Sequence, residues 1–276
     1  MTCAARSGGP PPPISRFLAL LAFLTTAGAH PEHVRIPGPG GTQLDAALVR
    51  PAGPVTGSAV VALHGCSGPY PARDGNWAVA LAQAGHPVLL PDSFGSRGLG
   101  SQCRVRHRSV TPSGLRRQDA IAAGEWLAAH PDLAKNGVAL IGWSNGGGTV
   151  LATANAAADP PECLFRRFVA FYPGCATRAR DPAWAPSAPL LVLVGEADDW
   201  VPAPPCRTLA ARYPDRITLV TYPGAYHDFD AANARVRVLH GLATPPSSSG
   251  QAHAGTNPAA REDALRRVPA FLDATP

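Results

Sequence analysis

Short apolar runs alternate with segments of helical periodicity along most of this chain. The apolar runs are bounded by Gly, Pro, Ser or Asp, which is typical of buried strands. The segments between them space their apolar residues three and four apart, as amphipathic helices do. This alternation predicts an α/β fold with a mainly parallel sheet that helices cover on both faces. We expect strands at residues 43–49, 58–63, 87–90, 138–141, 168–172, 189–195 and 217–222, and helices at 76–84, 113–129, 147–154, 205–213 and 257–272.

The N-terminal segment has a pattern of its own. Arg6 and Arg16 precede an apolar core at residues 17–24, and an A-x-A sequence follows at 27–29. These parts together are typical of a secretory signal peptide, and the apolar core is too short to span a bilayer. The full length of 276 residues suits one α/β domain. We therefore expect a signal peptide at residues 1–29, a single domain at 30–276, a secreted or periplasmic protein, and no membrane span in the mature chain.

The net charge and the spacing of Cys and His residues indicate which partners and cofactors to expect. The formal net charge is +5, and it falls to +3 without residues 1–29, which carry two arginines and no acid. Such a mild excess does not call for a nucleic-acid partner. The sequence has no Cys/His spacing of the zinc type. We therefore expect neither a metal nor an organic cofactor.

The most informative motif is G-W-S-N-G at residues 142–146. It follows an apolar strand and precedes a segment of small residues at 147–154. A nucleophilic serine needs this context of strand, tight turn and helix, because a strained backbone there lifts its hydroxyl clear of the sheet. The motif predicts that Ser144 is a nucleophile.

An acid and a histidine follow the next two strands in chain order. Asp198 and Asp199 come just after the strand at 189–195, and His227 follows the strand at 217–222. Both positions lie at the carboxyl ends of parallel strands, where α/β sheets build their sites. The order serine, acid, histidine is that of the α/β-hydrolases. His227 is the expected base for Ser144, with Asp198 or Asp199 to orient the imidazole.

The chain resembles the dienelactone hydrolase family of α/β-hydrolases over about residues 44–273. The resemblance implies the α/β-hydrolase fold and favours Asp198 as the acid, at the third position after the glycine that ends the strand. The namesake enzymes carry a cysteine nucleophile, whereas this chain has Ser144, which fits the serine-bearing, esterase-like members better. The motifs that carry the resemblance are H-G-C-S-G at 64–68, D-S-F-G-S-R-G at 92–98, the serine motif, G-E-A-D at 195–198 and P-G-A-Y-H-D-F at 223–229.

Acyl transfer places negative charge on the carbonyl oxygen, which two backbone N–H groups are expected to stabilise. One is that of Asn145, the residue after the nucleophile. The other lies in the loop after the strand at 58–63, and we nominate Cys66. We expect His64 and Asp228 to be structural residues, a hydrogen-bonded histidine and a loop anchor.

Four aromatic residues and one arginine are candidates for substrate contacts. Trp143, Tyr172, Trp200 and Tyr226 flank the predicted site and suit either an acyl or aryl pocket or core packing. Arg97 lies in the long loop after the strand at 87–90, together with three further arginines. It suits either a substrate carboxylate or a solvated basic loop.

Five cysteines remain in the mature chain, and an oxidising compartment would permit disulfides. The sequence does not decide the pairing. Topology favours Cys66 with Cys103 and Cys175 with Cys206, because each pair follows strands at the same sheet edge. The alternative is that these cysteines are small buried hydrophobic residues.

These observations predict a serine hydrolase that acts on a small-molecule ester or lactone through an acyl-enzyme on Ser144. Peptidase activity is an alternative within the same fold class. A non-catalytic binding protein on this fold is an alternative of another class, although such a scaffold has no need of Ser144, Asp198 and His227 together.

Overall fold

The computed structural model describes residues 31–158, 163–243 and 249–274. The predicted signal peptide at residues 1–29 lies outside this part of the chain. Within it, one eight-stranded sheet has the order β1-β2-β4-β3-β5-β6-β7-β8. The strands from β3 to β8 run parallel, and β1 and β2 are antiparallel additions at one edge. The strands are β1 (Glu32–Pro37), β2 (Gln43–Val49), β3 (Ala59–Leu63), β4 (Val88–Pro91), β5 (Val138–Trp143), β6 (Phe165–Phe171), β7 (Leu190–Gly195) and β8 (Ile217–Tyr222), with β9 (Arg237–Leu239) and β10 (Ala252–Ala254) in a separate hairpin.

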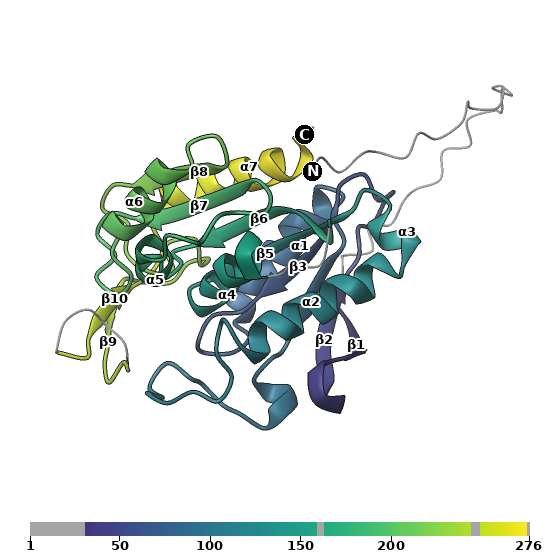
Figure 1. The fold of residues 1–276 in the computed structure, drawn as a ribbon, viewed down its shortest axis with the longest axis horizontal. Helices are drawn as coiled ribbons and strands as arrows, with labels where there is room; N and C mark the ends of the chain where they lie inside the picture. Colours follow the sequence, from purple (N-terminus) through teal and green to yellow (C-terminus); the bar gives the residue numbers. More distant parts are fainter. Residues whose placement is uncertain (1–30, 159–162, 244–248, 275–276) are drawn as a thin grey trace, which may run out of the picture.

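Helices cover both faces of the sheet, as the sequence predicted (Figure 1). One face packs against α2, α4 and α6, and the opposite face packs against α1 and α7. Within the described residues, no helix has the length and the hydrophobicity that crossing a membrane requires. The helices are α1 (Asn76–Gln83), α2 (Leu115–Ala128), α3 (Pro131–Ala134), α4 (Asn145–Thr153), α5 (Ala176–Arg180), α6 (Pro204–Arg212) and α7 (Pro258–Asp273), with short turns η1 (Pro39–Gly41), η2 (Pro71–Gly75), η3 (Gly95–Arg97) and η4 (Ala156–Ala158).

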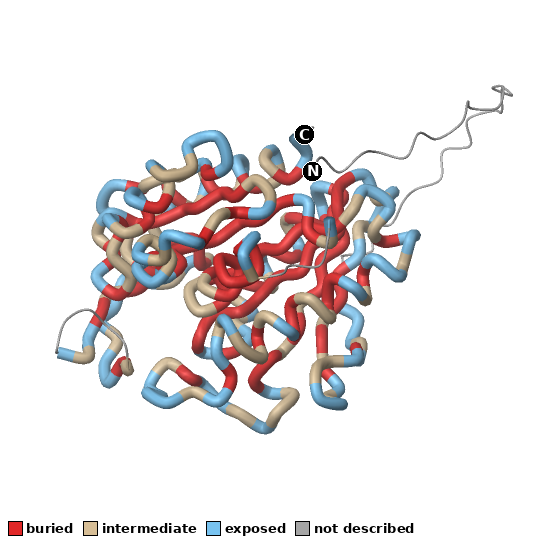
Figure 2. The backbone as a smooth tube through the Cα atoms, viewed as in Figure 1, coloured by how far each residue is buried: buried red, intermediate tan, exposed pale blue. Residues whose placement is uncertain are grey.

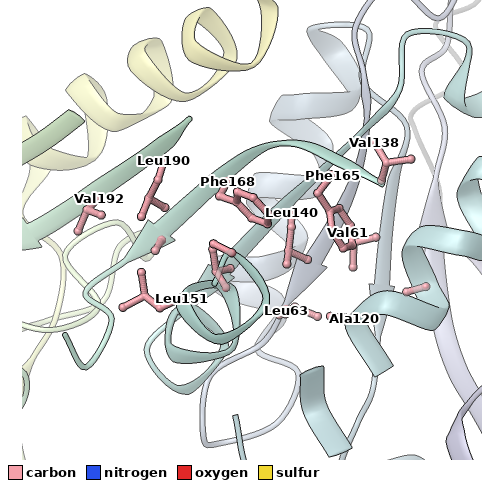
Figure 3. Close-up of a cluster of buried hydrophobic side chains, with 14 of the residues drawn as sticks. Val61, Leu63, Ala120, Val138, Leu140, Leu151, Phe165, Phe168, Leu190 and Val192 are labelled. Atoms are coloured by element: carbon pink, nitrogen blue, oxygen red, sulfur yellow. The ribbon is translucent and has the colours of Figure 1, made fainter. Parts of the chain in front are cut away.

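The central strands are buried on both faces, which explains their continuous apolar runs (Figure 2). Along β5, Val138 and Leu140 join the core on the α2 and α4 side, whereas Ile141 joins the core on the α1 and α7 side. Figure 3 shows the first of these cores, where Leu140 lies among side chains from the neighbouring strands and from α4, including Leu151. Because successive side chains point to opposite faces of the sheet, each central strand contributes to both hydrophobic cores.

Two elements differ from the sequence prediction. Strand β1 was not predicted, because only Ile36 of its six residues is buried and an edge strand of this kind leaves a weak pattern. No strand was predicted after residue 222, but Arg237–Leu239 and Ala252–Ala254 form the β9–β10 hairpin, and His227 and Ala254 form an isolated β-bridge.

Two disulfides form in the described part of the chain. Cys66 pairs with Cys103 and Cys175 pairs with Cys206, at sequence separations of 37 and 31. These are the two pairings that topology favoured. Each ties a loop at the carboxyl edge of the sheet to a second segment near the same edge.

Candidate active site

Ser144 lies between the end of β5 and the start of α4, in a strained backbone conformation. Its φ is 53° and its ψ is −112°, values that an L-residue adopts only when its surroundings impose them. The turn is possible because the residues two positions before and after Ser144 are glycines. A Cβ on Gly142 would lie 2.4 Å from the carbonyl oxygen of Gly146, and one on Gly146 would lie 2.1 Å from that of Leu63. The sequence around Ser144 thus builds the tight elbow that exposes a nucleophile.

The histidine and one of the two candidate acids are in direct contact. His227 Nδ1 lies 2.8 Å from Asp198 Oδ2, and both side chains are almost fully buried. The other oxygen of Asp198 accepts hydrogen bonds from the backbone N–H groups of Trp200 and Val201, at 2.9 and 2.8 Å. Asp198 is thereby held in one orientation, with one oxygen left for the imidazole.

Asp199 has a different partner. Its carboxylate lies 2.7 Å from His253 Nδ1 and also accepts the backbone N–H of His253 at 2.8 Å. Both side chains of this pair are about two-fifths exposed. Asp199 therefore anchors β10, the strand that carries His253, rather than the histidine of the site.

The environment of His227 suits a general base. Burial lowers its pKa, but the charge of Asp198 and the hydrogen bond to it outweigh burial, so the pKa lies above its ordinary value. His227 Nε2 is buried and has no hydrogen-bond partner among the described residues. With Nδ1 held by Asp198, Nε2 is the nitrogen left to exchange a proton with Ser144 or a substrate.

The two predicted oxyanion donors lie on adjoining segments. Asn145 is the first residue of α4, where helix geometry leaves the backbone N–H without an intrahelical acceptor. Cys66 lies in the loop after β3 and lines the same cavities as Ser144. Arg116 of α2 joins the two segments, donating to the carbonyl oxygen of His64 at 2.8 Å and to Asn145 Oδ1 at 2.5 Å. Burial lowers the pKa of Arg116 to about 9.

His64 itself has the structural role that was expected. Its Nδ1 lies 2.8 Å from the carbonyl oxygen of Gly65, and its Nε2 accepts the N–H of Ser93 at 3.2 Å. Burial, supported by the nearby positive charge of Arg116, places its pKa well below the ordinary value. A neutral, fully engaged imidazole of this kind stabilises the loop before Cys66.

Two cavities meet at Ser144. One has a volume of about 340 Å³ and is also lined by His227, Arg73 and the β9 region. The other has a volume of about 580 Å³ and extends past Asn145 toward α5. Cys66, Ser144 and Trp200 line both. Ser144 thus lies between two cavities that share its side chain as part of their wall.

Three of the four aromatic residues that the sequence suggested for substrate contacts differ in whether they line a cavity. Trp200 lines both cavities, and its ring centroid lies 4.6 Å from that of His227. Tyr172 is fully buried, with its ring 4.4 Å from His227, so it supports the imidazole from behind. Tyr226 stacks on His253 at 4.9 Å and lines neither cavity. Of these three, only Trp200 is a pocket residue.

Trp143 and Arg97 are not pocket residues either. Trp143 is fully buried in the core on the α1 and α7 side, and neither cavity reaches it. Arg97 forms a bidentate ion pair with the buried carboxylate of Asp119, at 2.9 and 2.7 Å. Its guanidinium is already used to fix the loop after β4 onto α2, so it is not free to bind a substrate carboxylate.

A buried polar network behind the site was not predicted. Asp230 is 1% exposed and accepts three hydrogen bonds, from Trp77 Nε1 and Trp143 Nε1 at 2.7 Å each and from the Tyr172 hydroxyl at 2.6 Å. Burial raises the pKa of Asp230 above its ordinary value. The Asp230 carboxylate thus connects the loop of His227 to Trp143, which precedes Ser144, and to Tyr172, whose ring packs against the imidazole.

Arg73 lies beside that network, with its guanidinium 5.4 Å from the centre of the Trp143 ring. It donates to Asp74 at 2.8 Å and to Asp228 at 2.6 Å, and it lines the smaller cavity. Asp228 follows His227 directly and has a φ of 56°, so the ion pair holds a strained residue next to His227. This is the anchoring role that the sequence predicted for Asp228. Arg73 could not be predicted from the sequence, because its partner Asp228 lies 155 residues away.

A mainly parallel sheet that brings a serine, an acid and a histidine from successive strand ends to one edge defines an α/β-hydrolase. The chain belongs to the dienelactone hydrolase family, whose model matches residues 44–275. Within the described residues there is no group of three or more His, Cys, Asp or Glu side chains that could hold a metal ion.

Solved structures agree with this assignment. Dienelactone hydrolase from Anabaena variabilis is 26% identical with a TM-score of 0.57, over 72% of this chain and 88% of that one. Esterase 2 of Thermogutta terrifontis is 18% identical with a TM-score of 0.61, over 89% and 94%. XC6422 from Xanthomonas campestris, an α/β serine hydrolase without a lid, is 23% identical with a TM-score of 0.58, over 89% and 97%. No curated protein sequence matches the chain.

Proposed function

We propose that this protein is a serine hydrolase that cleaves carboxylic esters or lactones through an acyl-enzyme on Ser144. The observation that carries the proposal is the placement of Ser144 in a strained elbow that lines the same cavity as His227, whose Nδ1 is held by Asp198 at 2.8 Å. A strained nucleophile, an oriented base and a buried acid are the parts that acyl transfer requires. A protein that only binds a ligand has no use for them together.

The reaction follows from these positions. Ser144 Oγ attacks the carbonyl carbon while His227 Nε2 takes its proton, and Asp198 stabilises the imidazolium that forms. The backbone N–H groups of Cys66 and Asn145 donate to the oxyanion of the tetrahedral intermediate. His227 then protonates the departing alkoxide, which leaves the acyl group on Ser144. A water molecule, deprotonated by His227, hydrolyses this acyl-enzyme and restores the serine.

The compartment is a separate part of the proposal. Two disulfides at the site, Cys66–Cys103 and Cys175–Cys206, support folding in an oxidising environment. Together with the signal-like sequence at residues 1–29, they support a secreted or periplasmic location.

The test is hydrolysis of p-nitrophenyl esters from acetate to octanoate by the mature protein and by Ser144→Ala. The proposal predicts hydrolysis by the wild type and a loss of several orders of magnitude in kcat/KM for the variant. The dependence on acyl length measures which of the two cavities takes the acyl group. If the wild type hydrolyses none of these esters and no lactone such as dihydrocoumarin, the ester assignment is refuted.

A further inference from the structure

Two segments beside the mouth of the site share an alternation of arginine and valine. Residues 104–108 read R-V-R-H-R and residues 235–240 read R-V-R-V-L-H. The first segment belongs to the loop after β4, and the second forms β9 and its flanks. We call the surface that these two segments form the arginine–valine face.

The two segments are joined to each other and to the site. Arg104 Nε donates to the carbonyl oxygen of His240 at 3.1 Å, and the N–H of Ala243 donates to that of Cys103 at 3.0 Å. The disulfide from Cys103 to Cys66 fixes the first segment to the oxyanion loop. Figure 1 shows the loop after β4 and the β9–β10 hairpin extending on the same side of the molecule. The face is therefore a fixed surface at the mouth of the site.

The charge of this face is unbalanced. Residues 93–118 and 231–261, which contain the two segments, include no aspartate or glutamate. Five arginines belong to the face, and four of them are exposed. Within the described part of the chain, none of the five forms an ion pair with a carboxylate. Asp228, which lines the same cavity as Arg104 and Arg237, is paired with Arg73, and Asp199 is paired with His253. A cationic surface without paired carboxylates among the described residues thus lies beside the entrance.

Apolar side chains are exposed on the same two segments. Along β9 the period of two turns Val238 to the side opposite Arg237 and Leu239, which line the smaller cavity, so the hairpin presents cationic and apolar side chains on its two sides. Among the described residues, four large hydrophobic side chains are exposed, and three of them belong here: Val105 at 36%, Val236 at 49% and Val238 at 39%. Isolated exposed valines are ordinary, but their concentration between unpaired arginines is not. A surface that offers both cations and apolar side chains fits a partner that offers both anions and an apolar interior.

We propose that the arginine–valine face docks this protein onto an anionic lipid surface, with the mouth of the site turned toward the lipid. Anionic headgroups attract surface arginines, and valines between them gain from contact with the acyl boundary. A nucleic acid fits less well, because the face has no Phe, Tyr or Trp on which bases could stack. Docking does not depend on Ser144. Its consequence, that esters at the surface reach the serine, rests on the proposed function.

Binding to vesicles tests the docking. The mature protein is expected to sediment with phosphatidylcholine vesicles that contain about 30 mol% phosphatidylglycerol, to ignore pure phosphatidylcholine, and to be released by high salt. Arg106→Gln with Arg235→Gln, neither of which lines a cavity, is expected to weaken binding roughly 25-fold, at about fivefold per arginine. Val105→Ser with Val238→Ser is expected to weaken it roughly fivefold without any change of charge.

A matched variant distinguishes an effect of this face from an effect of the protein's net charge. Arg166→Gln with Arg216→Gln removes the same charge from exposed positions at the amino ends of β6 and β8, at the opposite edge of the sheet. This variant is expected to bind like the wild type. Equal losses in both arginine variants, or no sedimentation of the wild type, would overturn the proposal. Equally tight binding to heparin with no effect of the valine changes would overturn it in favour of a soluble polyanion.

The proposed function is read out separately. Ser144→Ala is expected to bind vesicles like the wild type, and the Arg106/Arg235 variant is expected to hydrolyse soluble p-nitrophenyl acetate like the wild type. A failure of hydrolysis therefore leaves the docking result intact, and a failure of docking leaves the hydrolysis result intact.

Discussion

Replacing Asp198 with asparagine removes the charge that holds His227 while it keeps the shape of the side chain. Asp198 Oδ2 lies 2.8 Å from His227 Nδ1, and both groups are buried. The amide of asparagine can present an N–H to Nδ1, which would leave the proton on Nε2. His227 would then be unable to accept a proton from Ser144.

The expected loss follows from this burial. An imidazolium that forms next to a buried carboxylate is stabilised far more than one in water. We expect Asp198→Asn to lower kcat by about 10³–10⁴-fold, as is usual for the acid of a serine triad. Asp199→Asn is the matched control, because it is adjacent in sequence but pairs with His253 at a half-exposed position. Exposed pairs are worth about 1 kcal/mol at most, so its activity should change less than about fivefold.

The pH dependence gives an independent readout. His227 must be neutral to act as a base, so kcat/KM rises as pH increases through its pKa. Asp198 raises this pKa against the effect of burial, so the acid limb of the wild type should lie above the ordinary value for histidine. In Asp198→Asn the midpoint of the residual activity should move to lower pH. The assay is the pH profile of p-nitrophenyl acetate hydrolysis, and a larger loss in Asp199→Asn than in Asp198→Asn would refute the reasoning.

Three further predictions concern the supports of the site. Asp230→Ala should lower the free energy of unfolding by about 3 kcal/mol or more in urea, since three buried donors lose their acceptor; a loss under 1 kcal/mol would contradict this. Removing either disulfide by serine substitution should lower stability by about 2–4 kcal/mol, but only loss of Cys66–Cys103 should also lower kcat, because Cys66 belongs to the oxyanion loop; equal kcat values in both would count against that role. Arg116→Gln should lower kcat about tenfold with little change in KM, because it positions Asn145, whose N–H is used in the transition state; an effect on KM alone would argue otherwise.

The sheet and the nucleophile elbow could be predicted because local sequence determines both. Strands buried on two faces must be continuously apolar, as β5 is, and the elbow needs Gly142 and Gly146 beside Ser144. The choice of Asp198 over Asp199 came from the family motif. Periodicity alone could not separate two adjacent acids in one loop, which the structure directs to different histidines.

The supports of the site could not be predicted, because their partners are distant in sequence. Asp230 has its donors on three separate segments, and nothing near it in the chain indicates that Trp77 or Tyr172 will meet it. Trp143 is a different case. It lies two residues after Ile141 on β5, so both side chains pack on the side of α1 and α7. The sequence left a pocket wall and core packing open for Trp143, and the structure shows core packing.

The most direct test of the nucleophile is labelling of the mature protein with a fluorophosphonate, followed by mass spectrometry of its peptides. Such probes react with an activated serine hydroxyl and form a stable adduct. We predict one adduct on Ser144, which is absent in Ser144→Ala and much slower to form in Asp198→Asn. An unlabelled wild type, or an adduct on another residue, would contradict the assignment of Ser144 as the nucleophile.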